Sequence, residues 1–497
     1  MGPVVCSAIK HKQEVRTGVA EQSSCVLGID LGTSALKLVA ISRDGRVITT
    51  ARATYATIST AEGQAEQDPQ HWLKALSVSA KKIRSHLGKK AVIEAVALTG
   101  QMPTLVVMGK DKPIARAITW QDSRTDQWVS DRVDDRQRRE IYLKTGVRID
   151  GRYLAPMFQF HFRSKSRKAN LIFSAKDFLF HALTGLAATD PSTASGYGLY
   201  NLRVKAWDPK LCNFWGILVE QLPGIESSSF RAPLSRRGSQ LLGCKPSTPV
   251  VLGCADSVAG AHALNRGPVA SHTATLLTGS STVILKCDAQ PRWDQRNRFL
   301  VTPLALEGAY GREADLLASG SAREWATGVL GRTRKKSVWE LAYDAAPGAD
   351  GLLFAPFLAE GEQGILWNPS LRGTISGLTL SHDGAQIARA LLEGMCFEIR
   401  RCLEVFEQEA PLSSVRLAGW MAEVPQQSQL LADILGRPVH AFRLSSASAI
   451  GAALLSGLIN NKKYTESTKS IIFQPSRRKL LCNALYSKYV AQFPAKL

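Results

Sequence analysis

The sequence has no C-x-x-C pair among its 9 cysteines and no apolar run long enough to cross a membrane. The cysteine count is odd, and the cysteines are spread from Cys6 to Cys482. This spacing argues against a disulfide framework and favours free thiols in a reducing compartment. The segment 1–22 lacks the apolar core of a secretory signal, so we expect no signal peptide.

Acidic residues are scarce relative to basic ones. The 497 residues include 62 Lys and Arg against 42 Asp and Glu, which gives a formal net charge of +20. Such an excess indicates a polyanion, an acidic membrane surface or a phosphorylated substrate as a partner. Apolar residues make up 45% and charged residues 21%, and this globular balance excludes wholesale disorder, a collagen-like chain and a coiled coil.

The basic residues do not form a recognisable nucleic-acid-binding module. They are densest at 132–139, 163–168 and 477–479, and none of these runs alternates with aromatic residues. Charge runs of this kind are most often solvated faces of a folded protein. We therefore expect no nucleic acid partner, and salt-sensitive binding to arbitrary DNA would revive that alternative.

The last three residues resemble the S-K-L type of peroxisomal address. They are Ala495, Lys496 and Leu497, and an import receptor would read them as a free C-terminus. A chance match is the alternative, and it would leave the protein in the cytoplasm. The sequence thus predicts a peroxisome or the related glycosome as the location, with the import receptor as a partner.

Strand and helix patterns alternate along the chain, which predicts an α/β fold with a mixed sheet. In the first half, the expected strands are 26–29, 36–41, 47–53, 92–98, 105–108, 117–120 and 249–253, and the expected helices are 69–87 and 258–264. In the second half, the expected strands are 275–277, 282–285 and 415–417, and the expected helices are 385–409, 425–435 and 447–458.

One short pattern occurs twice, about 250 residues apart: an apolar strand, a turn of glycine and hydroxyl residues, and a second strand. Such a turn can hold phosphate oxygens with its backbone N–H groups and hydroxyls. Either turn alone is more often an ordinary hairpin, but the duplication suggests two facing hairpins that clamp the phosphates of a nucleotide. The turn residues are Gly32, Thr33, Ser34, Gly279, Ser280 and Ser281.

The duplication places a domain boundary near Gly267. The sequence therefore predicts a disordered extension at 1–24, an N-terminal domain at 25–266, a C-terminal domain at 267–460 and a basic tail at 461–497. The tail is weakly periodic and ends in the predicted targeting signal.

Two aspartates stand at the ends of expected strands. Asp30 ends the first strand, where a carboxylate could hold Mg²⁺ through water, although an ordinary turn aspartate is the alternative. Asp256 stands at the mouth of a helix, where Asp is a favoured N-cap. Its functional interpretation is a general base that takes a proton from a substrate hydroxyl during phosphoryl transfer.

Nine short runs, in their order and spacing, resemble the FGGY carbohydrate kinases, most closely the xylulokinase-like branch. They are LGIDLGTS (27–34), EQDP (66–69), GQM (100–102), ITWQDSR (118–124), AKD (175–177), GCADSVAGA (253–261), RGTISGL (372–378), RALLEG (389–394) and AIGAA (449–453). The resemblance implies two ribonuclease H-like domains of the actin–hexokinase superfamily with a cleft between them.

The resemblance also implies roles for single residues. Asp256 matches the catalytic base of the family and Asp30 its metal-associated carboxylate, with ATP and Mg²⁺ as cofactors. The two glycine and hydroxyl turns match the phosphate loops, and Gly419 and Ala422 stand in the adenosine motif. The residues that match the sugar pocket are Gln101, Met102, Trp120, Asp122 and Arg124. Core packing is an equal alternative for Trp120.

The sequence departs from the family pattern at three places. Pro103 stands where xylulokinases have a histidine, and Gly361-Glu362-Gln363 replaces a G-E-R run. The adenosine motif, normally G-G-G-A, reads Gly419-Trp420-Met421-Ala422. Since Trp420 and Met421 add bulk where adenosine should lie, the nucleotide sits differently, the indole stacks on the base, or nucleotide affinity is lost.

The resemblance implies an ATP-dependent kinase that phosphorylates a hydroxyl of a ketose or related sugar, with D-xylulose converted to D-xylulose 5-phosphate. The alternative is a catalytically weak family member that binds a sugar or a partner without turnover. The sequence does not decide the oligomeric state, and a homodimer is one alternative. The resemblance also implies anionic ligands, ATP and a sugar phosphate, which fit the basic charge of the chain.

Overall fold

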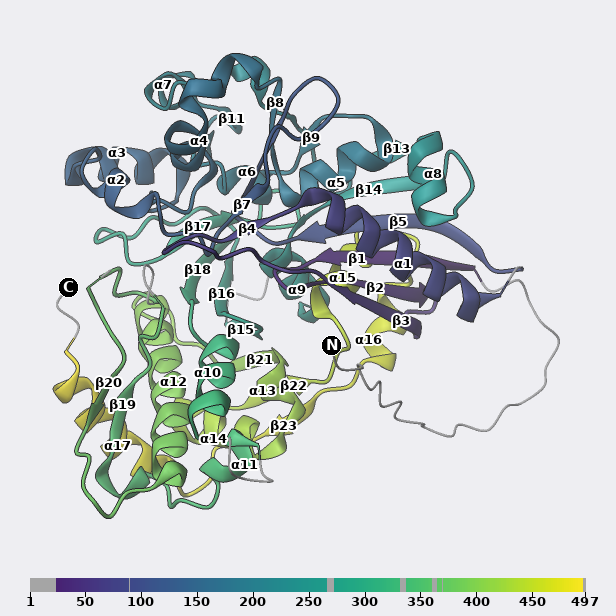
Figure 1. Ribbon diagram of the computed structural model, residues 1–497. Coiled ribbons are helices and arrows are strands. Elements are labelled where there is room, and N and C mark those ends of the chain that lie inside the picture. Colours follow the sequence, from purple (N-terminus) through teal and green to yellow (C-terminus); the bar gives the residue numbers. More distant parts are fainter. Residues whose placement is uncertain are drawn as a thin grey trace.

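The computed structural model describes residues 24–88, 90–265, 272–330, 337–359, 364–368 and 370–494, without the side chains of 165–167 (Figure 1). Several sequence predictions therefore lie outside the described residues. They concern the extension at 1–24 apart from Ser24, the boundary near Gly267, the run 361–363 and the C-terminal residues Ala495, Lys496 and Leu497.

The N-terminal half contains a six-stranded sheet in the order β13-β14-β5-β1-β2-β3. The strands β1, β5 and β14 are parallel, while β2, β3 and β13 pair in antiparallel fashion. Almost every residue of β1 is buried, which is typical of a parallel strand covered on both faces. The bounds are β1 (Ser24–Leu31), β2 (Ala35–Ser42), β3 (Val47–Thr54), β5 (Val92–Gly100), β13 (Arg231–Pro233) and β14 (Pro249–Ala255).

The C-terminal half contains a seven-stranded sheet in the order β17-β18-β16-β15-β21-β22-β23. Its centre repeats the first sheet, because the hairpin β15-β16 corresponds to β1-β2 and the parallel strands β21 and β22 correspond to β5 and β14. The predicted two-domain duplication is thus confirmed. The bounds are β15 (Thr273–Thr278), β16 (Thr282–Asp288), β17 (Leu300–Pro303), β18 (Tyr310–Leu316), β21 (Ser414–Gly419), β22 (Val439–Phe442) and β23 (Ile471–Phe473).

A four-stranded sheet in the order β4-β7-β6-β8 adds a third unit to the N-terminal half. Its strands are β4 (Glu66–Gln67), β6 (Thr104–Met108), β7 (Ala117–Thr119) and β8 (Leu171–Ser174). The remaining short strands form three pairs: β9 (Ala188–Thr189) with β12 (Gly224–Ile225), β10 (Tyr200–Asn201) with β11 (Ala206–Trp207), and β19 (Leu353–Ala355) with β20 (Thr374–Ser376).

The helix α1 (Pro69–Leu87) shows how local sequence sets these elements. Asp68 caps its N-terminus by accepting a backbone N–H of the first turn, and a proline occupies the first helical position. Trp72, Leu76 and Ile83 are fully buried on one face. The helix thus covers the first sheet with the apolar stripe that its sequence predicts.

Helices surround the sheets in both halves (Figure 1). Those of the N-terminal half are α2 (Asp126–Ser130), α3 (Asp135–Thr145), α4 (Leu154–Phe162), α5 (Ala175–Thr184), α6 (Pro191–Ser195), α7 (Pro209–Phe214), α8 (Arg236–Leu242) and α9 (Asp256–Leu264). Those of the C-terminal half are α10 (Gly320–Leu330), α11 (Val338–Ala342), α12 (Gly384–Phe406), α13 (Trp420–Glu423), α14 (Pro425–Leu435), α15 (Ala447–Leu454), α16 (Asn461–Ser467) and α17 (Lys479–Gln492). None of the described helices is both long and apolar enough for a membrane span.

Two helices rich in small residues, α9 and α15, pack closely between the halves. A Cβ on Gly28 of β1 would lie 1.9 Å from the carbonyl oxygen of Ala449, and a Cβ on Gly451 would lie 1.7 Å from the carbonyl oxygen of Ala259. Only glycine permits these approaches. The helix α15 therefore lies against the N-terminal sheet, although in sequence it stands between β22 and β23 of the C-terminal sheet.

The segment predicted as a basic tail, 461–497, is basic, but its described part is not a separate tail, because it forms α16, β23 and α17. The strand β23 pairs with β22 and extends the second sheet. In α17, the buried Tyr489 hydroxyl donates a hydrogen bond to Glu398 over 2.7 Å. The three buried residues of α17, Cys482, Tyr486 and Tyr489, follow the i, i+4, i+7 spacing of one helix face. The exposed Leu480 and Leu481 lie off that face and obscure the pattern in the sequence.

Candidate active site

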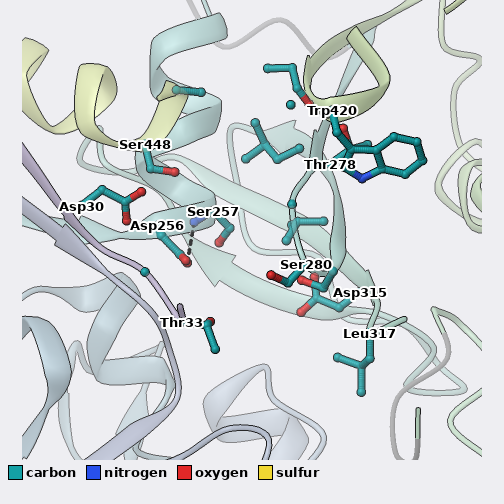
Figure 2. Close-up of a pocket in the computed structure, with 18 of the residues that line it drawn as sticks. Asp30, Thr33, Asp256, Ser257, Thr278, Ser280, Asp315, Leu317, Trp420 and Ser448 are labelled. Carbon is teal, nitrogen blue, oxygen red and sulfur yellow. Dashed lines mark hydrogen bonds between the residues drawn. The ribbon is translucent and has the colours of Figure 1, made fainter. Parts of the chain in front are cut away.

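A cleft of about 820 Å³ lies between the two halves and is lined by residues of both (Figure 2). Parallel strands β1 and β14 flank β5, with Asp30 and Cys254 both opposite Thr99. Asp30 and Asp256 therefore reach the same edge of the first sheet. Open α/β sheets bind ligands at this carboxyl edge of the strands.

Asp256 is half-buried at the N-terminus of α9 and lines the cleft. Its Oδ1 accepts a hydrogen bond from the backbone N–H of Ser257 over 2.9 Å. Burial, and then the charge of Asp30, raise the pKa of Asp256 to about 7. A carboxyl group with this pKa can accept a proton at neutral pH and is suited to general base catalysis.

Asp30 is 5% exposed at the end of β1. Its Oδ2 lies 3.6 Å from the Nζ of Lys37 and accepts a hydrogen bond from Ser446 over 3.5 Å. Its Oδ1 is buried and has no hydrogen-bond partner among the described residues. Burial raises the pKa of this carboxyl group, because the charged form lacks sufficient compensation.

The unpartnered oxygen of Asp30 fits a Mg²⁺ ion. Magnesium is commonly bound by one or two carboxylates together with water and substrate phosphates. The described residues contain no cluster of three His, Cys, Asp or Glu side chains that could enclose a metal, and a magnesium ion shared with phosphates needs none. The metal role predicted for Asp30 stays a prediction that this geometry supports.

The first predicted phosphate turn joins β1 to β2 and lines the cleft. Thr33 accepts hydrogen bonds on both of its oxygens, from Trp120 Nε1 to Oγ1 over 3.1 Å and from Gln67 Nε2 to the carbonyl over 2.7 Å. The Tyr55 hydroxyl donates to the carbonyl of Gly32. These bonds hold the turn from behind, while Ser34 at its tip is exposed.

The second predicted turn joins β15 to β16 and lines the same cleft. The N–H of Gly279 donates to the carbonyl of Ser281 over 2.8 Å. The carbonyl of Ser280 accepts the N–H groups of Ser319 and Ser321, each over 3.2 Å. The structure thus brings both turns to one cleft, as the duplicated pattern predicts, and their phosphate-binding role stays a prediction.

The residues predicted to bind the sugar divide into two groups. Met102 and Trp120 line the cleft, whereas Gln101, Asp122 and Arg124 are not among the described residues that line it. Asp122 is buried, and its Oδ2 lies 2.6 Å from Arg124 Nη2. Gln101 donates a hydrogen bond to Gln67 over 3.0 Å behind the first turn. The substrate role of these three residues stays a prediction.

Sequence reasoning missed further residues of the cleft that Met102 and Trp120 also line, notably Arg152 and Tyr153. The guanidinium Nη2 of Arg152 lies 2.7 Å from Asp150. A Cβ on Gly196 would lie 2.6 Å from Met102, which shows how closely α6 approaches the loop before β6. No local pattern marks these residues, because only the fold brings them into the cleft that Met102 also lines.

A buried network next to the end of β14, which precedes Asp256, was also missed. Lys176 is 1% exposed, and its Nζ lies 3.0 Å from Asp177 and 3.2 Å from Asp190. The Ser192 hydroxyl donates to Asp190 over 2.5 Å and accepts the backbone N–H of Ala255 over 3.0 Å. The network fixes the peptide that precedes Asp256. Asp190 also caps the N-terminus of α6. Because capping is a common role of aspartate, its part in the buried network could not be recognised from the sequence.

The adenosine motif forms the end of β21 and the start of α13. Gly419 has φ +96°, and a Cβ there would lie 2.0 Å from the carbonyl of Thr278, so glycine is required. Gly419 and Trp420 line the cleft, whereas the predicted cofactor residue Ala422 is buried and is not among the described lining residues. Met421 does not add bulk to the cleft, because its side chain is buried in the core of the C-terminal half.

Known proteins resemble the chain over nearly its whole described length. Residues 25–263 match the N-terminal domain of the FGGY family of carbohydrate kinases, and residues 274–458 match its C-terminal domain. A gluconokinase of Bacillus licheniformis is 27% identical over 456 residues, which cover 87% of each chain. A xylulose kinase of Lactococcus lactis subsp. lactis (strain IL1403) is 26% identical over 440 residues, covering 86% of this chain and 87% of that one.

The fold matches solved structures as well. A gluconate kinase from Lactobacillus acidophilus superimposes with a TM-score of 0.85 at 24% identity, covering 95% of this chain and 97% of the other. Both family domains, the duplicated sheets and the shared cleft lead to one conclusion: the chain belongs to the FGGY family of carbohydrate kinases.

Proposed function

We propose that this ATP-dependent sugar kinase transfers the γ-phosphoryl group of ATP to a hydroxyl of a ketose or related sugar, with D-xylulose as the foremost acceptor. One observation carries the proposal. Asp256, with a pKa of about 7, lines the cleft that both phosphate turns also line. A base and a phosphate clamp in one cleft are the parts that phosphoryl transfer to an alcohol requires.

In the proposed reaction, Asp256 accepts the proton of the acceptor hydroxyl as its oxygen bonds to the γ-phosphorus. The bond between that phosphorus and the bridging oxygen breaks, and ADP leaves. The turns that carry Thr33 and Ser280 orient the phosphates from opposite halves of the cleft. Mg²⁺, held by Asp30 and the phosphates, would neutralise part of their charge.

The acceptor end of the cleft combines an aromatic surface with polar groups. Trp120 is half-buried and fixed by its hydrogen bond to Thr33, and Met102, Arg152 and Tyr153 lie in the same lining. An aromatic ring can cover the apolar face of a sugar while nearby polar groups bind its hydroxyls. The relatives named gluconokinase and xylulose kinase make gluconate and D-xylulose the first acceptors to compare.

An acceptor panel tests this proposal. Purified protein with Mg·ATP is given D-xylulose, other ketoses, polyols and sugar acids, and ADP formation is measured for each. We expect one class to raise the rate of ADP release well above the rate without acceptor. A preference for gluconate would correct the acceptor, and the absence of acceptor-dependent ADP release would contradict kinase activity.

One observation favours a second candidate, a family member without turnover. Trp420 stands where the family pattern has glycine, and it lines the nucleotide half of the cleft. Calorimetric titration with Mg·ATP separates the two candidates. Binding at millimolar ATP or below supports the kinase, and no detectable binding in that range supports the weak or inactive protein.

We further propose import into a peroxisome or glycosome through Ala495, Lys496 and Leu497, with the cytoplasm as the alternative. The C-terminal tripeptide in the sequence supports this proposal. A fluorescent fusion that leaves the C-terminus free should enter the organelle, and removal of Leu497 should leave it in the cytoplasm. A cytoplasmic signal from the intact fusion would contradict the proposal.

A further inference from the structure

Two tryptophans form a stacked pair in the C-terminal half of the cleft. The rings of Trp339 and Trp420 are 5.4 Å apart at their centroids and differ by 7° in plane. Trp339 is 3% exposed, whereas Trp420 is half-buried, and both line the cleft. Trp339 thus supports Trp420 from behind and fixes the plane of its indole.

This indole pair lies next to the second phosphate turn. Thr278 and Gly419 are paired residues of β15 and β21, and each is followed directly by a residue of the cleft, Gly279 and Trp420. The Thr278 hydroxyl also accepts the N–H of Met421 over 3.1 Å. In Figure 2, Trp420 lies beside Thr278, on the side away from Asp30 and Asp256.

Polar atoms without partners gather at the same place. Trp339 Nε1, Trp420 Nε1, the Tyr343 hydroxyl and both side-chain heteroatoms of Gln427 are buried and have no hydrogen-bond partner among the described residues. All four residues line the cleft, and Gln427 is 0% exposed. Native proteins leave few buried polar groups unpaired, so this end of the cleft is built for a polar ligand.

The chemistry of these groups specifies a flat ligand with hydrogen-bonding edges. Parallel indoles offer a stacking face, and base–aromatic stacking strengthens nucleotide binding substantially. A glutamine amide offers one donor and one acceptor, which pair with N7 and the N6 amino group of adenine. Guanine and hypoxanthine present an acceptor at position 6 in place of the amino donor.

We propose that Trp420, supported by Trp339, is the stacking surface for the adenine of the phosphoryl donor, and that the Gln427 amide selects adenine. The proposal rests on the proposed kinase function. Trp420 does not close off the cleft, because Glu423 and Gln426, which follow it in sequence, line the same cleft. In this chain, stacking on the Trp420 indole therefore replaces the close contact between backbone and nucleotide that glycines would allow.

The contribution of the base is measured by comparing Mg·ATP with magnesium tripolyphosphate, which lacks base and ribose. Binding is followed by calorimetry and by quenching of tryptophan fluorescence, so catalysis is not needed. We expect the intact protein to bind ATP about tenfold or more tightly than tripolyphosphate. Trp420→Ala should abolish most of this difference and the quenching, while Trp420→Phe should retain most of the difference.

A matched control keeps this test specific. Trp325 is 42% exposed on α10 and is not among the described residues that line the cleft. Trp325→Ala should leave the preference for ATP and the ligand-induced quenching as in the intact protein. Thermal unfolding of each variant verifies that it is folded. Tighter ATP binding by Trp420→Ala would overturn the proposal, because Trp420 would then obstruct the nucleotide.

The role of Gln427 is tested by comparing ATP with ITP, whose base carries an oxygen at position 6. The intact protein should prefer ATP, and Gln427→Leu should bind the two nucleotides within about twofold. An unchanged preference in this variant would overturn base selection by Gln427.

If the intact protein binds ATP and tripolyphosphate equally yet phosphorylates a sugar, only the stacking surface is contradicted. If it binds neither, the kinase function fails as well.

Discussion

The carboxylate of Asp30 raises the pKa of Asp256 across the cleft floor, second only to the effect of burial. The two residues end parallel strands on either side of β5, so the sheet itself holds two carboxylates close together. Because the two carboxylates repel each other when both are ionised, Asp256 keeps its proton to a higher pH than an isolated carboxyl group. A cation bound at Asp30 would relieve this repulsion and make Asp256 a readier base.

The first prediction concerns the pH dependence of the reaction. The pKa of Asp256 is about 7 in the free protein, and the base must be ionised to accept a proton. We therefore expect kcat/KM to fall about tenfold per pH unit below pH 7 and to level off above it. Initial rates between pH 5 and pH 9 measure this profile, and a flat profile down to pH 5 would contradict the role of Asp256.

The second prediction concerns stability. Since the folded state raises the pKa of Asp256 from 3.8 to about 7, it binds more protons than the unfolded state between these values. Stability from this group is therefore lost as pH rises through that window. Asp256→Asn should raise Tm by a few degrees, roughly, at pH 8 and by less at pH 5.5.

A matched control for this stability effect is Asp44→Asn. A hydrogen bond from Ser42 lowers the pKa of the half-buried Asp44 carboxyl, so its ionised form is stabilised. This variant should not gain stability at pH 8. Differential scanning calorimetry of both variants at two pH values decides the matter, and an unchanged Tm for Asp256→Asn at pH 8 would refute a raised pKa.

The third prediction concerns the buried network next to the end of β14. The Ser192 hydroxyl accepts the N–H of Ala255, the residue before Asp256. Ser192→Ala should lower kcat about tenfold with little change in KM, because it loosens the base and not the sugar pocket. Ser192→Thr, which keeps the hydroxyl, should recover most of the rate.

The control for this positioning effect is Ser85→Ala. Ser85 is exposed on α1, where its hydroxyl donates to the carbonyl of Lys82 over 2.8 Å, and its loss should not change steady-state kinetics. Equal losses of kcat in Ser192→Ala and Ser192→Thr would argue against a positioning role. A rise in KM alone would indicate that Ser192 supports the sugar pocket instead.

The fourth prediction concerns the contact between α9 and α15. Gly451→Ala would place a methyl group 1.7 Å from the carbonyl oxygen of Ala259, so the helices must separate. We expect a large loss of stability, seen as a Tm lower by several degrees or as insoluble protein. Gly328→Ala, where a methyl group meets nothing within 4 Å, should slightly stabilise α10. Equal Tm values for the two variants would contradict the close packing.

The two strand–turn–strand patterns in the sequence predicted that both turns line one cleft, and the structure shows that they do. A strand, a glycine and hydroxyl turn and a second strand form a local unit, so Thr33 and Ser280 could be identified without tertiary information. Asp30 and Asp256 were identifiable because both end apolar strands. The sheet order then brings them to one edge, as parallel strands require.

Residues that depend on long-range packing could not be predicted in the same way. Arg152 and Tyr153 line the cleft because the start of α4 is hydrogen-bonded to the end of α6, which in turn lies against Met102. The sequence cannot show that Met421 turns into the core while Trp420, its neighbour, faces the cleft. The helix α17 was missed because the exposed Leu480 and Leu481 obscure the stripe of buried residues that ends at Tyr489.

The most direct test of the account is acceptor-dependent ADP release by the intact protein and by Asp256→Asn, measured with Mg·ATP and the best acceptor of the panel. Loss of a general base should lower kcat by about 10²- to 10⁴-fold, while calorimetry shows Mg·ATP binding within a fewfold of the intact protein. A variant that releases ADP at the rate of the intact protein would contradict the assignment of Asp256 as the base of this kinase.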